Sequence, residues 1–136
     1  MKEWISDYIA AERKALDTIP VDQVAAAIET VKEVLQNDRQ IFVFGNGGSA
    51  AIASHVSVDL TKAAGVRAVS FNESDLITCF ANDYGYQHWL AKAIEAYGDS
   101  GDVAVLISSS GQSPNIVNAA HCARDRNLTV LTLSGF

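Results

Sequence analysis

Four serine hydroxyls lie within six residues of one another in the segment SSSGQS, from Ser108 to Ser113. The segment follows an apolar run and precedes Pro114, a residue favoured in the first turn of a helix. Hydroxyl groups and the unpaired N–H groups of a helix start can together hold a phosphate dianion without any lysine. A serine run can also be a solvated turn or a helix cap, but its place after a core strand favours phosphate binding.

A glycine-rich loop, GNGGSA, occupies residues 45–50 after the apolar run of residues 41–44. It fits the G-x-G-x-x-G/A pattern of dinucleotide-binding loops, but the acidic candidate Glu73 lies beyond the expected spacing of about 20 residues. No GK[ST] triplet follows, which excludes a nucleoside triphosphate loop. A nicotinamide-dependent dehydrogenase stays open as an alternative, as does a turn that only joins strand to helix. The serine segment 108–113 offers a second place for a phosphate group, which favours a sugar phosphate as the ligand. No nucleotide cofactor is therefore expected.

His55 and Asp59 are four residues apart in a segment that reads as a helix. That spacing places both side chains on one helical face, where they could bond to each other, share a metal, or present a base to a ligand. A histidine near a subunit boundary beside a surface aspartate would show the same spacing.

Apolar runs that alternate with helical segments indicate how these residues are positioned. The runs are residues 41–44, 66–71, 103–107 and 128–133, and the helical segments between them are 50–63, 87–96 and 114–125. Strands that are apolar throughout and separated by helices predict a parallel sheet covered on both faces, hence a doubly wound α/β fold. Ligands of such folds bind outside the carboxyl ends of the strands, where both loops and residues 72–75 fall.

Two amphipathic helices, residues 2–17 and 20–38, are predicted before the first strand, and residues 82–86 read as a turn. We expect a single domain over residues 1–136, with an N-terminal helical extension at 1–38 and an α/β core at 39–136. The formal charge of −6 argues against nucleic acid as a partner. No apolar run is long enough for a membrane span, so the sequence predicts a cytoplasmic protein without a membrane partner.

Three motifs in order, GNGGSA…H…DLT, CFANDYGY and GDVAVLISSSGQSPNI, resemble the sugar isomerase (SIS) domain, and within it the sedoheptulose 7-phosphate isomerases, also called phosphoheptose isomerases. The resemblance covers essentially the whole chain. It implies a parallel α/β sandwich preceded by helices and a homotetramer with active sites between subunits. It also implies conversion of sedoheptulose 7-phosphate to D-glycero-D-manno-heptose 7-phosphate, an early step towards the heptoses of bacterial lipopolysaccharide and other surface polysaccharides.

The resemblance also assigns residues. His55 matches the position of a zinc ligand in many members, which makes zinc a candidate cofactor, and Asp59 matches a glutamate that serves as general base and as a further ligand. The substrate-binding positions that the motifs imply are Asn46, Gly47, Gly48 and Ser49 in the first loop, Asn82 and Asp83 in the second, and Ser108, Ser109, Ser110 and Ser113 around the phosphate.

Two departures from the family pattern matter. Asp59 draws the carboxylate back by about 1.5 Å relative to a glutamate, and a misplacement of that order can cost about 100-fold in rate. Family members also continue through a last strand and a helix that carries a glutamine and a histidine, the partner acid or base, which this sequence does not match. We therefore expect a partial chain, the alternative being a fold completed in another way. The rival to an isomerase is a non-catalytic SIS domain that binds a sugar phosphate as a sensor or assembly partner.

Overall fold

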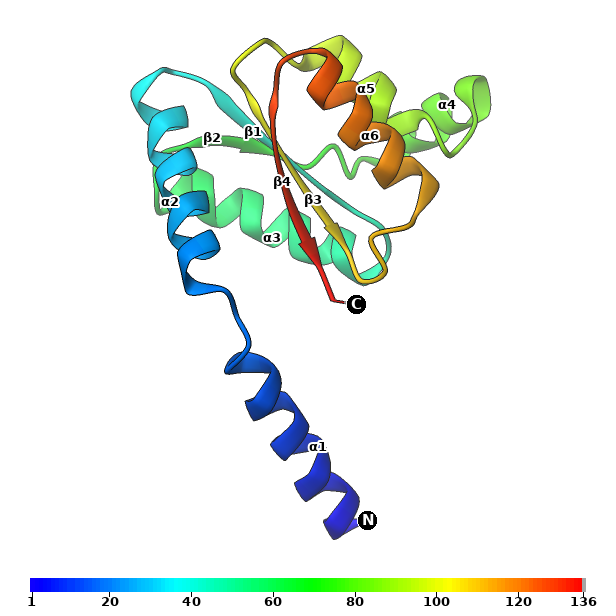
Figure 1. Ribbon diagram of the computed structural model, residues 1–136. Helices are drawn as coiled ribbons and strands as arrows, with labels where there is room; N and C mark the ends of the chain where they lie inside the picture. Colours follow the sequence, from blue (N-terminus) through cyan, green and yellow to red (C-terminus); the bar gives the residue numbers. More distant parts are fainter. Residues whose placement is uncertain (136) are drawn as a thin grey trace. The chain divides into compact units, whose positions relative to one another are not determined.

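A computed structural model describes residues 1–135 of the chain (Figure 1). After two N-terminal helices, helices and strands alternate from β1 onward except between β2 and β3, where two helices follow each other. In chain order the elements are α1 (Lys2–Leu16), α2 (Val21–Gln36), β1 (Gln40–Gly45), α3 (Gly48–Lys62), β2 (Arg67–Val69), α4 (Ser74–Tyr84), α5 (Trp89–Tyr97), β3 (Val103–Ser108), α6 (Pro114–Asp125) and β4 (Thr129–Ser134).

The four strands form one parallel sheet in the order β2-β1-β3-β4. In the register, Phe42 of β1 stands beside Val69 of β2 on one side and Ala104 of β3 on the other. β1 and β3 are the central strands and are buried almost throughout, which is why both read as unbroken apolar runs. The prediction of a doubly wound parallel α/β fold is confirmed.

Successive residues of a strand point to opposite faces of the sheet, so each central strand contributes side chains to two hydrophobic clusters, one on each face. Phe42 and Phe44 pack with Trp89 of α5 and with α6 in one cluster. Ile41 and Val43 pack in the other cluster with residues of α3 and the end of α2. In Figure 1, α3 accordingly lies on one face of the sheet, and α5 and α6 lie on the other.

The helix α4 was not predicted. The Asn, Asp and Gly residues of segment 82–86 predict a turn there, but the helix continues to Tyr84 and the turn begins at Gly85. Leu76, Ile77 and Phe80 are spaced to lie on one helical face, and they pack against the core beside Phe42. That packing outweighs the turn preference of the polar residues that follow.

The edge strand β2 is also shorter than predicted. It covers Arg67–Val69 instead of residues 66–71. Phe71 has φ +47°, a left-handed conformation that cannot continue a strand. Its ring stacks on Phe42 at 5.5 Å between centroids, which shows that core packing holds the backbone in this unusual state.

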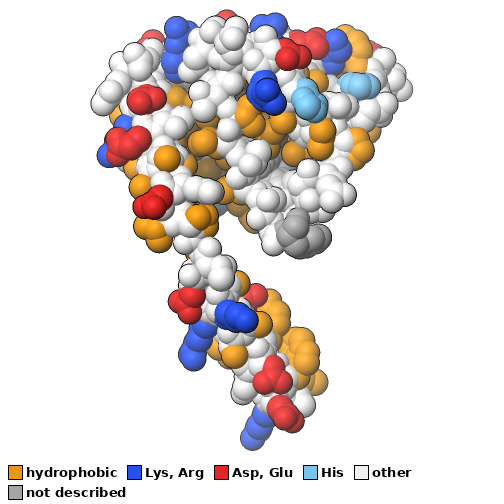
Figure 2. Space-filling model, viewed as in Figure 1, with side chains coloured by type: hydrophobic (Ala, Val, Ile, Leu, Met, Phe, Trp, Pro, Cys, Tyr) orange, Lys and Arg blue, Asp and Glu red, His pale blue; other side chains and the backbone are white. Residues whose placement is uncertain are grey.

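Contacts within the chain divide it into two compact units, residues 1–30 and the residues from Val31 onward. The division falls inside α2, and in the second unit Val31 and Val34 of this helix pack against the core. In the first unit, α1 exposes large apolar side chains, and Figure 2 shows them as orange patches along that helix. Trp4 and Tyr8 stack on each other there, with ring centroids 5.7 Å apart. No helix in residues 1–135 is long and apolar enough to cross a membrane.

Asp102 ties the amino ends of the two central strands together. Its side chain is only 2% exposed, and it accepts three hydrogen bonds. The backbone N–H and side-chain amide of Gln40 both donate at 3.1 Å, and the backbone N–H of Asp99 donates at 2.9 Å. The carboxylate therefore pairs donors at the start of β1 with the turn before β3.

We expect Asp102→Ala to lower the free energy of unfolding by about 2 to 4 kcal/mol, because each buried donor left without an acceptor costs about 1 to 3 kcal/mol. Denaturation with urea measures this loss. Asp99→Ala is the matched control, since the Asp99 side chain is exposed and only its backbone N–H takes part. Equal losses in the two variants would contradict the proposed role of the Asp102 carboxylate.

Candidate functional site

The glycine loop makes a tight junction between β1 and α3. A Cβ on Gly45 would lie 2.5 Å from the backbone carbon and oxygen of Ser49, so no larger residue fits there. Gly47 has φ +54°, which favours glycine. The backbone N–H of Ser49 donates to the carbonyl of Asn46 at 3.0 Å and closes the turn. The first turn of α3 therefore begins directly at the end of β1.

The serine loop makes the equivalent junction between β3 and α6. The N–H of Gly111 donates to the Ser108 carbonyl at 3.2 Å, and the N–H of Gln112 donates to Ser110 Oγ at 3.2 Å. Ser113 is the N-cap residue of α6, yet its hydroxyl makes no capping hydrogen bond. This hydroxyl is therefore free to face a ligand.

The two loops enclose one small polar cavity of about 150 Å³. They meet because β1 and β3 are neighbours in the sheet, with Gly45 paired beside Ile107. Both α3 and α6 begin beside the cavity, and the N-terminal ends of helices carry partial positive charge that favours an anion. None of the lining residues is charged; they are Asn46, Ser49, Ile107, Ser108, Ser109, Ser110 and Ser113.

The structure thus brings together six of the predicted site residues from the two loops, while Gly47 and Gly48 lie exposed in the same turn as Asn46. Asn82 and Asp83 lie elsewhere. They are exposed in the last turn of α4, where Asn82 Nδ2 donates to Asp83 Oδ1 at 2.9 Å, and they do not line the cavity.

Two residues that sequence reasoning missed hold Asn46. Asn115 of α6 forms a reciprocal pair of amide hydrogen bonds with it, and the Tyr86 hydroxyl donates to Asn46 Oδ1 at 3.1 Å. Asn115 is 2% exposed although it is polar and follows Ser-Pro at a helix start. In the sequence, only the position of Asn115 next to Ile116, on the buried side of the predicted helix, hints that Asn115 is buried. This position does not identify its partner Asn46, which lies 69 positions away.

His55 and Asp59 lie on the exposed side of α3. The distance from His55 Nε2 to Asp59 Oδ2 is 3.5 Å, and the two side chains are 79% and 64% exposed. They are outside the cavity, since α3 starts there at Gly48 and a rise of 1.5 Å per residue places Asp59 roughly 16 Å further along the helix axis. The anion cavity and the His55–Asp59 pair are therefore separate within one chain.

The His55–Asp59 pair supplies two of the four ligands that zinc takes in proteins. No group of three or more histidine, cysteine, aspartate or glutamate side chains within residues 1–135 is arranged to hold a metal ion. The described residues by themselves do not fit a zinc site. A zinc ion bound here would need two ligands from elsewhere.

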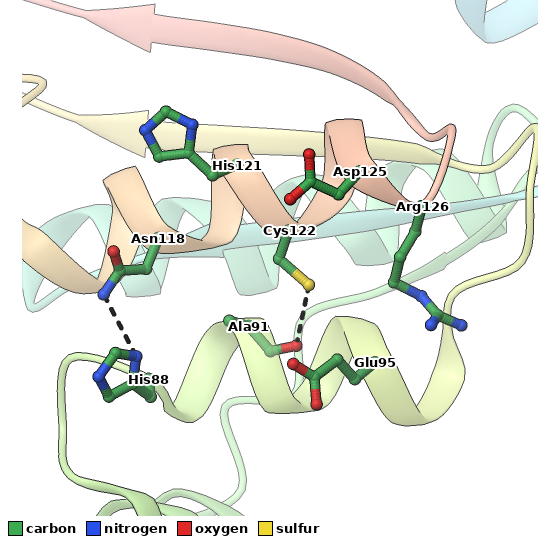
Figure 3. A pocket seen from close by; sticks show the side chains of 8 residues that line it. All are labelled: His88, Ala91, Glu95, Asn118, His121, Cys122, Asp125 and Arg126. Carbon is green, nitrogen blue, oxygen red and sulfur yellow. Dashed lines mark hydrogen bonds between the residues drawn. The ribbon is translucent and has the colours of Figure 1, made fainter.

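A larger groove of about 500 Å³ lies between α5 and α6 (Figure 3). Two contacts join lining residues: Asn118 Nδ2 lies 3.4 Å from His88 Nδ1, and the Cys122 thiol donates to the Ala91 carbonyl at 3.4 Å. Burial raises the pKa of Cys122, which keeps the thiol neutral and unreactive near pH 7. The carboxylates of Glu95 and Asp125 line this groove, which makes it less favourable for an anion than the uncharged cavity.

Comparison with known proteins places this chain in a family. The family model of the SIS domain matches residues 6–135. The chain is 34% identical to the phosphoheptose isomerase of a Bradyrhizobium species over 134 residues, which covers 94% of this chain and 68% of the relative. Curated phosphoheptose isomerases of Neisseria gonorrhoeae are 35% identical, with 96% of this chain and 68% of the relative covered.

Comparison with solved structures finds similarity to the same enzymes. The fold matches phosphoheptose isomerase GmhA from Neisseria gonorrhoeae with a TM-score of 0.87 and 35% identity, covering 98% of this chain and 72% of that one. A phosphoheptose isomerase from Francisella tularensis matches with the same TM-score at 27% identity, again covering 98% of this chain and 72% of the other. The chain therefore belongs to the SIS domain family and, within that family, is similar to phosphoheptose isomerases.

Proposed function

We propose that this protein is a phosphosugar isomerase that converts sedoheptulose 7-phosphate into D-glycero-D-manno-heptose 7-phosphate, a step in heptose biosynthesis. The observation that carries the proposal is the polar cavity at the carboxyl edge of the sheet, formed jointly by the glycine loop and the serine loop. The similarity to phosphoheptose isomerases supports the choice of substrate and reaction.

The cavity would hold the phosphate group of the sugar. Ser108, Ser109, Ser110 and Ser113 offer hydroxyls, and the start of α6 offers backbone N–H groups. Asn46, Gly47, Gly48 and Ser49 would contact the sugar from the other loop. Anchoring a phosphate remote from the reacting carbons supplies binding energy that positions the carbon skeleton.

Asp59 is the proposed base. In the reaction a carboxylate removes the proton from the carbon next to the carbonyl, which gives an enediol, and a proton is returned to the neighbouring carbon while another moves between the two oxygens. His55, with Nε2 at 3.5 Å from Asp59 Oδ2, would orient this carboxylate. Zinc stays a possible cofactor of this pair: His55 and Asp59 would supply two of its ligands, and two further ligands would come from elsewhere.

The separation of Asp59 from the cavity supports an active site shared between copies of the chain. Within one chain, α3 carries Asp59 roughly 16 Å away from its own N-terminus at the cavity. A carboxylate at that distance would act on a sugar phosphate held by another copy. Exposed apolar residues of α1, including Trp4 and Ile5, support association with other copies of the chain, and a homotetramer is the proposed assembly.

The second candidate is a SIS domain that binds a sugar phosphate without turnover, as a sensor or assembly partner. The high exposure of His55 and Asp59 favours it, because general bases usually act in sites that exclude water. Both candidates share the phosphate cavity and differ only in the chemistry at Asp59.

Turnover separates these candidates directly. Incubation of the protein with sedoheptulose 7-phosphate is expected to produce the aldose, seen as its anomeric proton signals by NMR. Binding of the sugar phosphate without any aldose would contradict the isomerase and support the sensor.

For the phosphate anchor, we expect Ser113→Ala to lower kcat/KM by about 10-fold to 100-fold, since a hydrogen bond to a charged group contributes about 1.5 to 3 kcal/mol. Stability should change little, because the Ser113 hydroxyl makes no capping bond. Steady-state kinetics and titration with inorganic phosphate measure the effect. Ser100→Ala is the control, as Ser100 is exposed in the turn before β3, at the opposite edge of the sheet.

For the base, we expect Asp59→Glu to raise kcat, by up to about 100-fold if the longer side chain restores the carboxylate position. Asp59→Asn should abolish turnover while phosphate binding persists. The conservative control Asp22→Glu alters an exposed aspartate in the first turn of α2 and should have no effect. Activity that is retained in Asp59→Asn would rule out this carboxylate as the base.

A further inference from the structure

We propose that Asn115 is a positioning residue for the phosphate cavity. The hydrogen bonds between its side-chain amide and that of Asn46 set the position of the glycine loop relative to the serine loop. They also limit the side chain of Asn46 to one hydrogen bond with the substrate. The inference rests on the proposed function for the identity of the ligand, but the geometry that carries it belongs to the described residues alone.

The pair is fully reciprocal. Asn46 Nδ2 donates to Asn115 Oδ1 at 2.9 Å, and Asn115 Nδ2 donates to Asn46 Oδ1 at 2.8 Å. Asn115 is 2% exposed and Asn46 is partly buried, so water competes poorly for either bond. Two parallel hydrogen bonds between planar amides fix both the distance and the relative tilt of the groups.

The position of the pair couples the two loops. Asn46 directly follows the last residue of β1, and Asn115 lies two residues after Ser113, in the first turn of α6. The bonds therefore span the gap between the glycine loop and the serine loop at the wall of a cavity of only about 150 Å³. A cavity so small loses its fit to a phosphate if its walls move apart.

Tyr86 completes the arrangement from a third segment, the turn after α4. Its hydroxyl donates to Asn46 Oδ1 at 3.1 Å. A carbonyl oxygen has two lone pairs, so the Asn115 and Tyr86 donors use the acceptor capacity of Asn46 completely. The Asn46 side chain keeps one amide N–H for a ligand, and its role towards the sugar phosphate is that of a single hydrogen-bond donor.

Asn115→Asp tests the pairing through pH. A protonated carboxyl can donate to Asn46 Oδ1 and accept from Asn46 Nδ2, as the amide does, whereas a carboxylate cannot donate and places one oxygen against Asn46 Oδ1. Burial raises the pKa of the introduced carboxyl, whereas the start of α6 lowers it, so the pH at which the carboxyl is protonated is measured in the variant itself. The pair is broken above that pH and re-formed below it.

The measured quantity is the dissociation constant of inorganic phosphate, taken as the ratio of variant to unmodified protein at each pH so that titration of phosphate itself cancels. We expect the variant to bind about 10-fold more weakly when the carboxyl is ionised, a change of the size that one broken buried hydrogen bond causes, and the ratio to return towards one when it is protonated. Repulsion between the carboxylate and phosphate acts in the same direction, so exchange in the ligand-free loops decides whether the pairing is the cause. Asn118→Asp on the same helix is the matched control, with a ratio near one at each pH.

Amide hydrogen exchange in the absence of any ligand provides an independent readout. In Asn115→Asp with the carboxyl ionised, we expect faster exchange in residues 46–49 and 108–113 than in the unmodified protein, and unchanged exchange in the central strands. If Asn115→Asp does not fold, Asn46→Asp breaks the same pair from its more exposed partner and is measured by exchange in the same way.

Unchanged exchange in both loops would overturn the inference. A loss of phosphate affinity that does not recover when the carboxyl is protonated would overturn it as well, because it would reflect general damage and not the pairing. Failure of the proposed function is distinguishable: an unmodified protein that neither turns over sedoheptulose 7-phosphate nor binds phosphate refutes that function, while the exchange measurement still tests the coupling of the loops.

Discussion

Parallel pairing of β1 with β3 at the centre of the sheet is the constraint on which the rest of the structure depends. Residues 41–45 of β1 stand in register with residues 103–107 of β3. The carboxyl ends of parallel strands lie at the same edge of the sheet, so this register places the glycine loop beside the serine loop at that edge. It also requires both faces to be covered, because the side chains of each strand point alternately into two cores.

The cavity at that edge is suited to an anion in a chain that carries a net charge of −6. A cluster of lysines would attract many polyanions, whereas the cavity offers hydroxyls, one amide and two helix starts. Such dipoles act only at short range and in a fixed geometry, so the proposed phosphate group would have to fit the space closely. The mutual hydrogen bonds of Asn46, Asn115 and Tyr86 make that geometry specific.

Helix α3 links two regions with different chemistry. Its first turn borders the cavity, and its exposed side carries His55 and Asp59 further along. Ala53 and Ser57, on the opposite side of the same helix, are buried against the sheet. One face of the helix is thus packed against the sheet, while the other exposes His55 and Asp59 to solvent or to another molecule.

The sequence by itself determined the strands, the two loops and the fold class, because apolar runs, glycines and serines act through local conformation and burial. It did not reveal α4, whose apolar face at Leu76 and Phe80 is weaker in sequence than the turn residues after it and gains its stability from the core. Nor could it identify the pairing of Asn46 with Asn115, since a hydrogen bond across 69 positions depends on strand order and register. Only the tertiary structure decided which polar residues meet, because the direction of a side chain in space is set by packing and not by its place in the chain.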